Sequence, residues 1–215
     1  MPNRIGTDYH AYDASLVRKE GQLFVEVGSI TGNNAIELTK LFGRPRVVVY
    51  EALPDNFRTL NNSLVGYKNV VTINKAVSDH DGESEFFVYD TLNSSSLYQR
   101  DNEKKNLVKQ VTVCTVDILG VIENLAPYLP IDTLLLNCEG AEGVILNRIM
   151  RSLQAINSIN QISVEFHPKI KIGVEFKELI NLLASHYDVS HVIRTNYLFT
   201  RKGITNASDN DKGTE

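Results

Sequence analysis

The chain contains the stretch Leu23-Phe24-Val25-Glu26-Val27-Gly28-Ser29-Ile30-Thr31-Gly32-Asn33-Asn34, in which an apolar strand runs directly into two spaced glycines. Glycine lets a backbone approach a ligand closely, and a helix that begins near Asn33 has free N–H groups in its first turn. A second apolar run, Val47-Val48-Val49-Tyr50-Glu51, ends on an acid. A carboxylate at that strand end can accept hydrogen bonds from both hydroxyls of a ribose. The two runs together predict a nucleotide-type cofactor site in an α/β domain.

The rest of the chain alternates between strands and helices, the pattern of a mostly parallel sheet with helices on both faces. The expected sheet strands are residues 23–27, 46–50, 70–74, 133–136, 161–166, 189–193 and 197–200. The expected helices are residues 34–42, 54–64, 142–152 and 174–185. The last two strands would form a hairpin that places one antiparallel strand in the sheet. Residues 83–89 and 110–115 are expected to pair as an inserted β-hairpin.

The composition is that of a globular protein, with 215 residues, 42% apolar residues and 22% charged residues. The net charge of -4 gives no basic face for nucleic acid. The sequence has no run of about 18 apolar residues that could span a membrane, and its start lacks the apolar stretch of a secretory signal. We therefore expect a cytoplasmic protein with no nucleic-acid partner. Cys114 and Cys138 lie in apolar runs, which favours buried, reduced thiols over a disulfide.

Three parts are expected along the chain. Residues 1–22 would form an N-terminal segment that packs near the cofactor site. Residues 23–202 would form the single α/β domain. Residues 203–215 are rich in Asn, Asp, Ser and Gly and would form a disordered tail.

The spacing of Gly28 and Gly32 distinguishes two classes of cofactor. It differs from the G-x-G-x-x-G of dinucleotide enzymes and fits the looser loop of S-adenosylmethionine (SAM) methyltransferases better. An NAD(P)-dependent oxidoreductase stays open as an alternative, because a strand, glycines and a downstream acid are all present. A tight strand-to-helix turn without any ligand is the plain structural alternative.

Seven segments, in order, resemble the FkbM family of SAM-dependent methyltransferases. They are Val25-Glu26-Val27-Gly28 with Gly32-Asn33; Tyr50-Glu51-Ala52 with Pro54 and Asn56; Asn74-Lys75-Ala76-Val77-Ser78-Asp79 with Gly82; Ser95-Ser96-Leu97; Thr115-Val116-Asp117; Asn137-Cys138-Glu139-Gly140-Ala141-Glu142; and Val164-Glu165-Phe166-His167-Pro168. The resemblance spans residues 24–168. It implies a Rossmann-like class I methyltransferase fold and O-methylation, in many members on sugars or glycosylated small molecules.

By this resemblance the cofactor would be SAM, and the product S-adenosylhomocysteine (SAH). The expected cofactor contacts are Glu26, Gly28, Ser29, Gly32, Asn33, Glu51, Ala52, Asn56, Asn74, Ala76 and Val77. Glu26 would pair with the amino group of the cofactor, and it could equally stabilise the positive end of the following helix. Asn74, Ala76 and Val77 would meet the adenine ring; the alternative is a plain turn between strands.

The chemistry implied is in-line attack by a hydroxyl oxygen on the methyl carbon of a sulfonium. Alignment of oxygen, carbon and sulfur would supply most of the rate, and a general base would add about 10²–10⁴-fold. Glu139 and His167 are alternative bases, each with a structural alternative: Glu139 could only favour a helix N-terminus, and His167 could only end a strand. The family usually has Asp at the positions of Glu26 and Asn137. Asn137 cannot act as a base and removes a charge, so we expect no metal site.

Residues outside the strand ends are candidates for the acceptor site. Ser95 and Ser96 could line a pocket with hydroxyls, or form a plain polar loop. Tyr9 and Tyr12 could stack on a sugar face or cover a cofactor. Residues 99–109 would form a solvated loop or a lid. The expected partner is a glycan or glycosylated metabolite. The Asn137 difference also keeps open a non-catalytic SAM-binding module.

Overall fold

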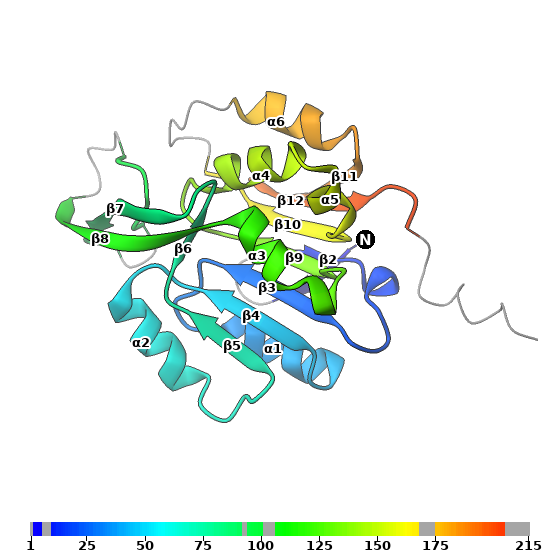
Figure 1. Cartoon of the computed structure of the whole chain (residues 1–215), viewed down its shortest axis with the longest axis horizontal. Helices are drawn as coiled ribbons and strands as arrows, with labels where there is room; N and C mark the ends of the chain where they lie inside the picture. Colours follow the sequence, from blue (N-terminus) through cyan, green and yellow to red (C-terminus); the bar gives the residue numbers. More distant parts are fainter. Residues whose placement is uncertain (1, 6–9, 92–93, 101–105, 168–174, 205–215) are drawn as a thin grey trace, which may run out of the picture.

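The computed structural model describes residues 2–5, 10–91, 94–100, 106–167 and 175–204 (Figure 1). Its centre is a seven-stranded sheet with the order β11-β12-β10-β9-β3-β4-β5. The strands are β3 (Leu23–Val27), β4 (Arg46–Tyr50), β5 (Val70–Ile73), β9 (Thr133–Leu136), β10 (Gln161–Glu165), β11 (Tyr187–Ile193) and β12 (Asn196–Arg201). Neighbouring strands are parallel except that β12 runs antiparallel to both β10 and β11. The Rossmann-like fold with a C-terminal antiparallel strand is therefore confirmed.

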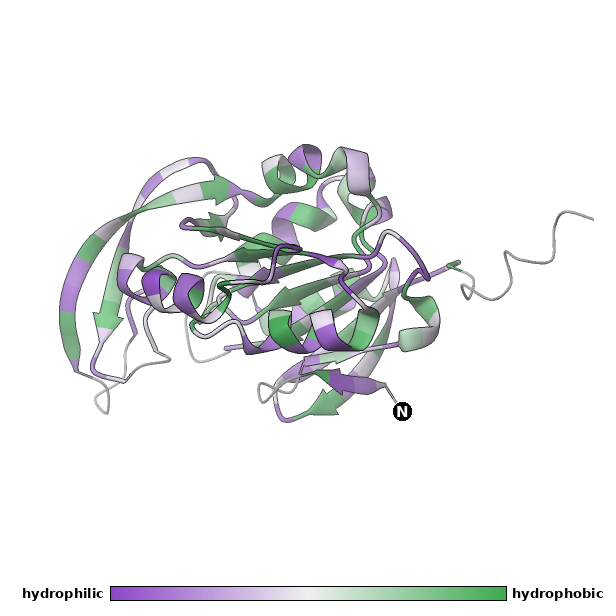
Figure 2. Ribbon diagram, turned by 90° about the horizontal axis from the view of Figure 1, so that it is seen from below, coloured by the Kyte–Doolittle hydropathy of each residue, from purple (hydrophilic) through white to green (hydrophobic). Residues whose placement is uncertain are grey.

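Helices cover both faces of this sheet because side chains alternate along each strand. They are α1 (Asn33–Phe42), α2 (Pro54–Ser63), α3 (Ile118–Asn124), α4 (Glu142–Met150), α5 (Leu153–Asn157) and α6 (Phe176–Leu183). Leu23, Val25 and Val27 pack with α3–α6, whereas Phe24 packs with α1 and α2 on the other face. Figure 2 shows the hydrophobic residues concentrated in the central strands and alternating with hydrophilic ones along the helices. In the described part of the chain, no helix has the length and apolarity needed to cross a membrane.

Two helices differ from the sequence predictions. The helix expected over 142–152 ends at Met150, because the Ser152 side chain accepts from the backbone N–H of Ala155 and begins the separate helix α5. Helix α3 was not expected, although Asp117 is a good N-cap and accepts from the N–H of Leu119 at 2.9 Å. A short helix with few turns carries too weak a periodicity to be recognised in the sequence.

The inserted hairpin is present and is longer than expected. It consists of β7 (Gly82–Tyr89) and β8 (Leu107–Asp117), which pair antiparallel, and β6 (Ala76–Ser78) adds a parallel strand to β8. Phe86 and Val113 pack inward against Leu53 and Ala76. Because neighbouring residues on a strand face opposite sides, Cys114 is exposed, and the prediction of a buried thiol there was wrong. Cys114 and Cys138 are both free, as expected.

The N-terminal segment folds back across the sheet. It contains β1 (Asn3–Ile5), β2 (His10–Tyr12) and the 3-10 helix η1 (Ala14–Leu16). His10 Nδ1 lies 3.1 Å from Ser163 Oγ in the middle of β10, and Ser163 Oγ also accepts from the Ala11 N–H at 2.8 Å. Tyr12 packs edge-to-face on Phe42, with ring centroids 5.5 Å apart. The Tyr12 ring is thus part of the core and not of an acceptor surface. Tyr9 lies outside the described residues, and so does most of the expected C-terminal tail.

Asp132 joins this segment to the sheet at the end opposite the carboxyl edge. Its side chain is fully buried, and Oδ2 accepts from the Leu23 N–H at 2.8 Å and from Arg18 Nη2 at 2.9 Å. Oδ1 accepts from the Arg18 N–H at 2.9 Å. One carboxylate therefore holds the start of the central strand β3 and the segment that precedes it.

We predict that Asp132→Ala lowers the free energy of unfolding by about 3 kcal/mol, because it leaves the Arg18 charge and the Leu23 N–H without their partner. Asp55→Ala is the matched control: Asp55 pairs with Arg58 and Lys109 only at the surface, and its loss should cost less than about 1 kcal/mol. Urea denaturation measures both. Equal losses in the two variants would contradict this role for Asp132.

Candidate functional site

The carboxyl edge of the sheet opens into a pocket at the point where the strand order reverses. From β3 the chain proceeds to β4 and β5 on one side, and then returns to β9 on the other side. Loops leaving β3 and β9 therefore diverge, which is where ligands bind in open α/β sheets. The pocket has a volume of about 350 Å³, within the usual range for small-molecule sites.

Twelve of the predicted site residues line this pocket: Glu26, Gly28, Ser29, Asn33, Glu51, Ala52, Asn56, Ala76, Val77, Ser95, Asn137 and Glu139. Other lining residues were not predicted as site residues, although several lie in the quoted motifs; among them are Asn34, Tyr50, Leu53, Lys75, Phe86, Leu97, Cys138 and Ala141. Phe86 and Leu97 belong to the insertion, so their approach to the pocket depends on how the hairpin folds over the sheet. No local sequence pattern shows how the hairpin folds over the sheet.

Some predicted residues support the pocket wall from behind. Asn74 Nδ2 donates to the backbone oxygens of Glu51 and Ala52, at 2.8 Å and 3.0 Å, and so holds the loop after β4. Ser96 Oγ donates to the backbone oxygen of Glu139 at 2.5 Å. Gly32 begins α1 with a positive φ of 74°. None of these three residues lines the pocket, and neither do Tyr12 and His167.

Gly28 sets the distance between the two diverging loops. Its φ is +85°, and a Cβ at this position would lie 2.0 Å from the backbone oxygen of Asn137. The N–H of Asn137 donates to the oxygen of Val27 at 3.1 Å, so the start of the loop after β9 is bonded to the end of β3. Only glycine permits this approach, for both steric and conformational reasons.

Two buried acids, Glu26 and Glu51, line the pocket beside Gly28 and Ala52. Glu26 Oε1 accepts from Asn34 Nδ2 at 3.0 Å, which joins the end of β3 to the first turn of α1. Glu51 Oε1 accepts from the Leu53 N–H at 2.8 Å. Burial raises the pKa of Glu51 to about 7, because the charged form loses hydration. Both acids reach the pocket from strand ends, as the sequence predicted.

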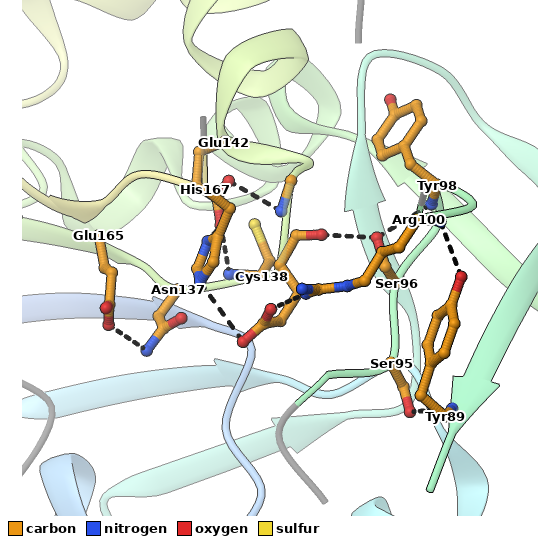
Figure 3. A network of polar contacts seen from close by, with 12 residues as sticks. Tyr89, Ser95, Ser96, Tyr98, Arg100, Asn137, Cys138, Glu142, Glu165 and His167 are labelled. Carbon is orange, nitrogen blue, oxygen red and sulfur yellow. Dashed lines mark hydrogen bonds and ion pairs between the residues drawn. The ribbon is translucent and has the colours of Figure 1, made fainter. Parts of the chain in front are cut away.

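The opposite side of the pocket holds a chain of acidic and basic groups (Figure 3). Buried Glu142 accepts from the N–H groups of Cys138 and Gly140, at 2.8 Å and 2.9 Å. Its Oε1 also lies 3.0 Å from His167 Nδ1. The other ring nitrogen, Nε2, lies 3.4 Å from Glu139 Oε1. His167 thus lies between two carboxylates, and of its two neighbours only Glu139 lines the pocket.

Arg100 completes this chain from the insertion. Its guanidinium pairs with Glu139 Oε2, its side chain is 10% exposed, and its backbone N–H donates to Tyr89 Oη at 2.7 Å. Of the two alternatives for residues 99–109, a solvated loop does not describe Arg100, and residues 107–109 belong to β8. Residues 101–105 lie outside the described part. Glu139 has a positive φ of 55°, a rare conformation for a non-glycine residue. The bonds from Ser96 and Arg100 hold it there.

Cys138 is the one thiol among the residues that line the pocket. Burial, with Glu142 nearby, raises the pKa of the Cys138 thiol well above its ordinary value, so the sulfur is a protonated thiol and a poor nucleophile. Among the described residues, no group of three or more His, Cys, Asp or Glu side chains is arranged to hold a metal ion.

Comparisons with known proteins found solved methyltransferase structures that are similar to this chain in fold, at low sequence identity. No family model matches the sequence, and no curated protein matches it. Fibrillarin from Aeropyrum pernix, solved with natively bound SAM, is 12% identical over 88% of this chain and 69% of its own, with a TM-score of 0.49. A methyltransferase from Geobacter sulfurreducens is 15% identical over 85% of this chain and 73% of its own, with a TM-score of 0.45. An Agrobacterium tumefaciens protein described as a predicted O-methyltransferase is 8% identical over 88% and 79%, with a TM-score of 0.45.

The raised pKa of Glu51 makes stability depend on pH. The folded protein retains a proton between the ordinary value of 4.5 and about 7, where the unfolded chain has lost it. The free energy of unfolding therefore falls as pH rises through this window. The shift corresponds to on the order of 3 kcal/mol.

We predict that Glu51→Gln, which cannot ionise, becomes more stable relative to the wild type as pH rises from 5 to 8, by about 2–3 kcal/mol. Urea denaturation of both proteins at the two pH values measures this difference. A stability difference that is the same at both pH values would show that Glu51 is not the buried group that titrates.

Proposed function

We propose that this protein is a SAM-dependent O-methyltransferase of the FkbM type, which methylates a hydroxyl of a sugar unit in a glycan or glycosylated metabolite. The observation that carries the proposal is the shared pocket. One side has the Gly28 loop and buried Glu51 at adjacent strand ends, and the other has Asn137 and Glu139 with the insertion. A donor and an acceptor can therefore meet in one cavity.

The residues on the first side fit SAM. Gly28 lines the pocket, and its missing side chain lets the loop after β9 pack directly against it. Buried Glu51 offers a carboxylate to ribose hydroxyls. Glu26, Ser29 and Asn33 would face the amino-acid part, whereas Ala52, Asn56, Ala76 and Val77 would face the ribose and adenine. Bound SAM supplies a methyl group already activated on sulfur. The protein then has to orient the acceptor and receive its proton.

A dinucleotide oxidoreductase is the less favoured alternative. Dinucleotide folds commonly order six parallel strands as 3-2-1-4-5-6. Here the last strand, β12, is antiparallel and lies between β10 and β11. This arrangement and the Gly28–Gly32 spacing both support the methyltransferase reading.

Glu139 is the proposed proton acceptor, because it lines the pocket while His167 lies behind it. Glu142 accepts only, so it holds His167 with the Nδ1–H directed to it. The lone pair of a neutral Nε2 would then face an oxygen of Glu139, and the two would repel each other. A proton held between Nε2 and this oxygen removes the repulsion. His167 would thus share the proton that Glu139 takes from the acceptor hydroxyl.

The insertion supplies the proposed acceptor surface. Leu97 offers apolar area and Ser95 offers a hydroxyl in the same pocket as Glu139. Phe86 adds apolar area where it packs against Ala76. A sugar presents both C–H faces and hydroxyls, so this mixture suits it. Ser96 does not line the pocket, but its hydroxyl holds the backbone of Glu139.

Calorimetric titration with SAH and NADH tests the cofactor assignment. We expect wild-type protein to bind SAH and not NADH, and Glu51→Ala to weaken SAH binding about 10-fold or more, since a ribose hydroxyl loses its buried partner. Cys114→Ser, on the exposed face of the hairpin, is the control and should bind as the wild type does. Unchanged SAH affinity in folded Glu51→Ala would reject this role for Glu51, and NADH binding would reject the proposed class.

Mass spectrometry of products formed from SAM and an oligosaccharide panel tests the chemistry. We expect Glu139→Gln to lower single-turnover rates by about 10²-fold with SAH affinity nearly unchanged. His167→Asn should cost less, because it removes the proton-sharing partner and leaves the carboxylate. Glu85→Gln on the hairpin is the control.

Activity should persist in EDTA, as expected from the lack of a carboxylate at position 137. If Glu139→Gln keeps near-normal turnover and His167→Asn loses most of it, His167 is the base and Glu139 is not. Normal turnover in both variants would leave alignment alone as the source of the rate.

A further inference from the structure

Asn137 and Glu165 lie at the ends of neighbouring strands, and their side chains meet. β9 and β10 are parallel, and Leu136 pairs with Val164 in their register, so the next residue of each strand falls side by side. Asn137 Nδ2 donates to Glu165 Oε2 at 3.1 Å (Figure 3). The contact is therefore a consequence of strand register, and both residues lie at the edge where the pocket opens.

This contact fixes which end of the amide faces the pocket. A primary amide has a donor end and an acceptor end, whereas a carboxylate only accepts. The NH₂ group of Asn137 must then face Glu165, and Oδ1 is directed away from it. Asn137 lines the pocket, and no described residue donates to its Oδ1. The pocket therefore has a fixed acceptor oxygen at this point.

The backbone under this amide is equally constrained. The N–H of Asn137 donates to the oxygen of Val27 at 3.1 Å. The Asn137 carbonyl packs against Gly28, where a Cβ would lie only 2.0 Å from its oxygen. Neither the backbone nor the amide of Asn137 can readily turn, so the direction of Oδ1 is determined by the protein before any ligand binds.

We propose that Glu165 is a positioning residue, which holds the Asn137 amide so that Oδ1 accepts a hydrogen bond from the hydroxyl that becomes methylated. The inference rests on the proposed function. It adds an orienting group beside the proton acceptor Glu139. The hydroxyl donates to Asn137 Oδ1 when the acceptor binds, which leaves a lone pair of its oxygen free to attack the methyl carbon. As the bond from oxygen to carbon forms and the bond from carbon to sulfur breaks, the hydroxyl proton passes to Glu139, because an amide oxygen cannot retain it. In this proposal Glu165 influences the acceptor hydroxyl through Asn137 and does not touch it.

A pair of reciprocal substitutions tests this orientation. Asn137→Asp places a second carboxylate against Glu165, and we expect turnover to fall about 10²-fold because repulsion displaces the oxygen that faces the pocket. Adding Glu165→Gln should restore turnover to within about tenfold of the wild type, since the new amide donates to the new carboxylate. SAH affinity, measured by calorimetry, should be the same in the wild type, in Asn137→Asp and in the double variant. A double variant as slow as Asn137→Asp alone would overturn the proposal, even if its thermal stability recovered.

A second measurement does not depend on activity. Nitrogen-15 NMR of wild-type protein should show the side-chain NH₂ of Asn137 as shifted and slow to exchange with water, and Glu165→Ala should abolish both features. Unchanged shift and exchange in Glu165→Ala would overturn the positioning role. Failure of wild-type protein to bind SAH would instead reject the proposed function, so the two failures are distinguishable.

Discussion

The close approach of Gly28 to the backbone of Asn137 is the constraint on which the rest of the site depends. It joins the loops that leave the two central strands, β3 and β9, at the point where the strand order reverses. A side chain at position 28 would separate these loops by pushing on the Asn137 carbonyl. The proposed donor side and the proposed acceptor side are adjacent because this position has no side chain.

The insertion contributes to the site as much as the sheet does. Ser96 and Arg100 both bond to Glu139, one at its backbone oxygen and one at its carboxylate. These bonds maintain a backbone conformation that a glutamate rarely adopts. On the other side, Glu142 holds the same loop, because it accepts from the backbone N–H groups of Cys138 and Gly140 and contacts His167. Glu139 is therefore positioned both by the insertion and by the start of α4, which are distant from each other in sequence.

The sequence predicted those features that depend on local patterns. Apolar runs located the seven sheet strands, and glycine with a following acid located the Gly28 and Glu51 side of the pocket. What it missed depends on contacts across the fold. Arg100 belongs to a charged stretch, and its partner Glu139 lies 39 residues away, so the stretch alone suggested a solvated loop. Tyr12 lies in the core because the N-terminal segment folds back over the sheet, and no local pattern shows that return.

The central claim is that one pocket at the reversal of the sheet brings a SAM-type donor next to Asn137 and Glu139. A crystal structure of the protein with SAH tests it most directly. The account predicts that the ribose hydroxyls lie within hydrogen-bonding distance of Glu51 and that the sulfur faces Asn137 and Glu139. SAH bound with its ribose away from Glu51, or with its sulfur directed away from the insertion, would contradict the account.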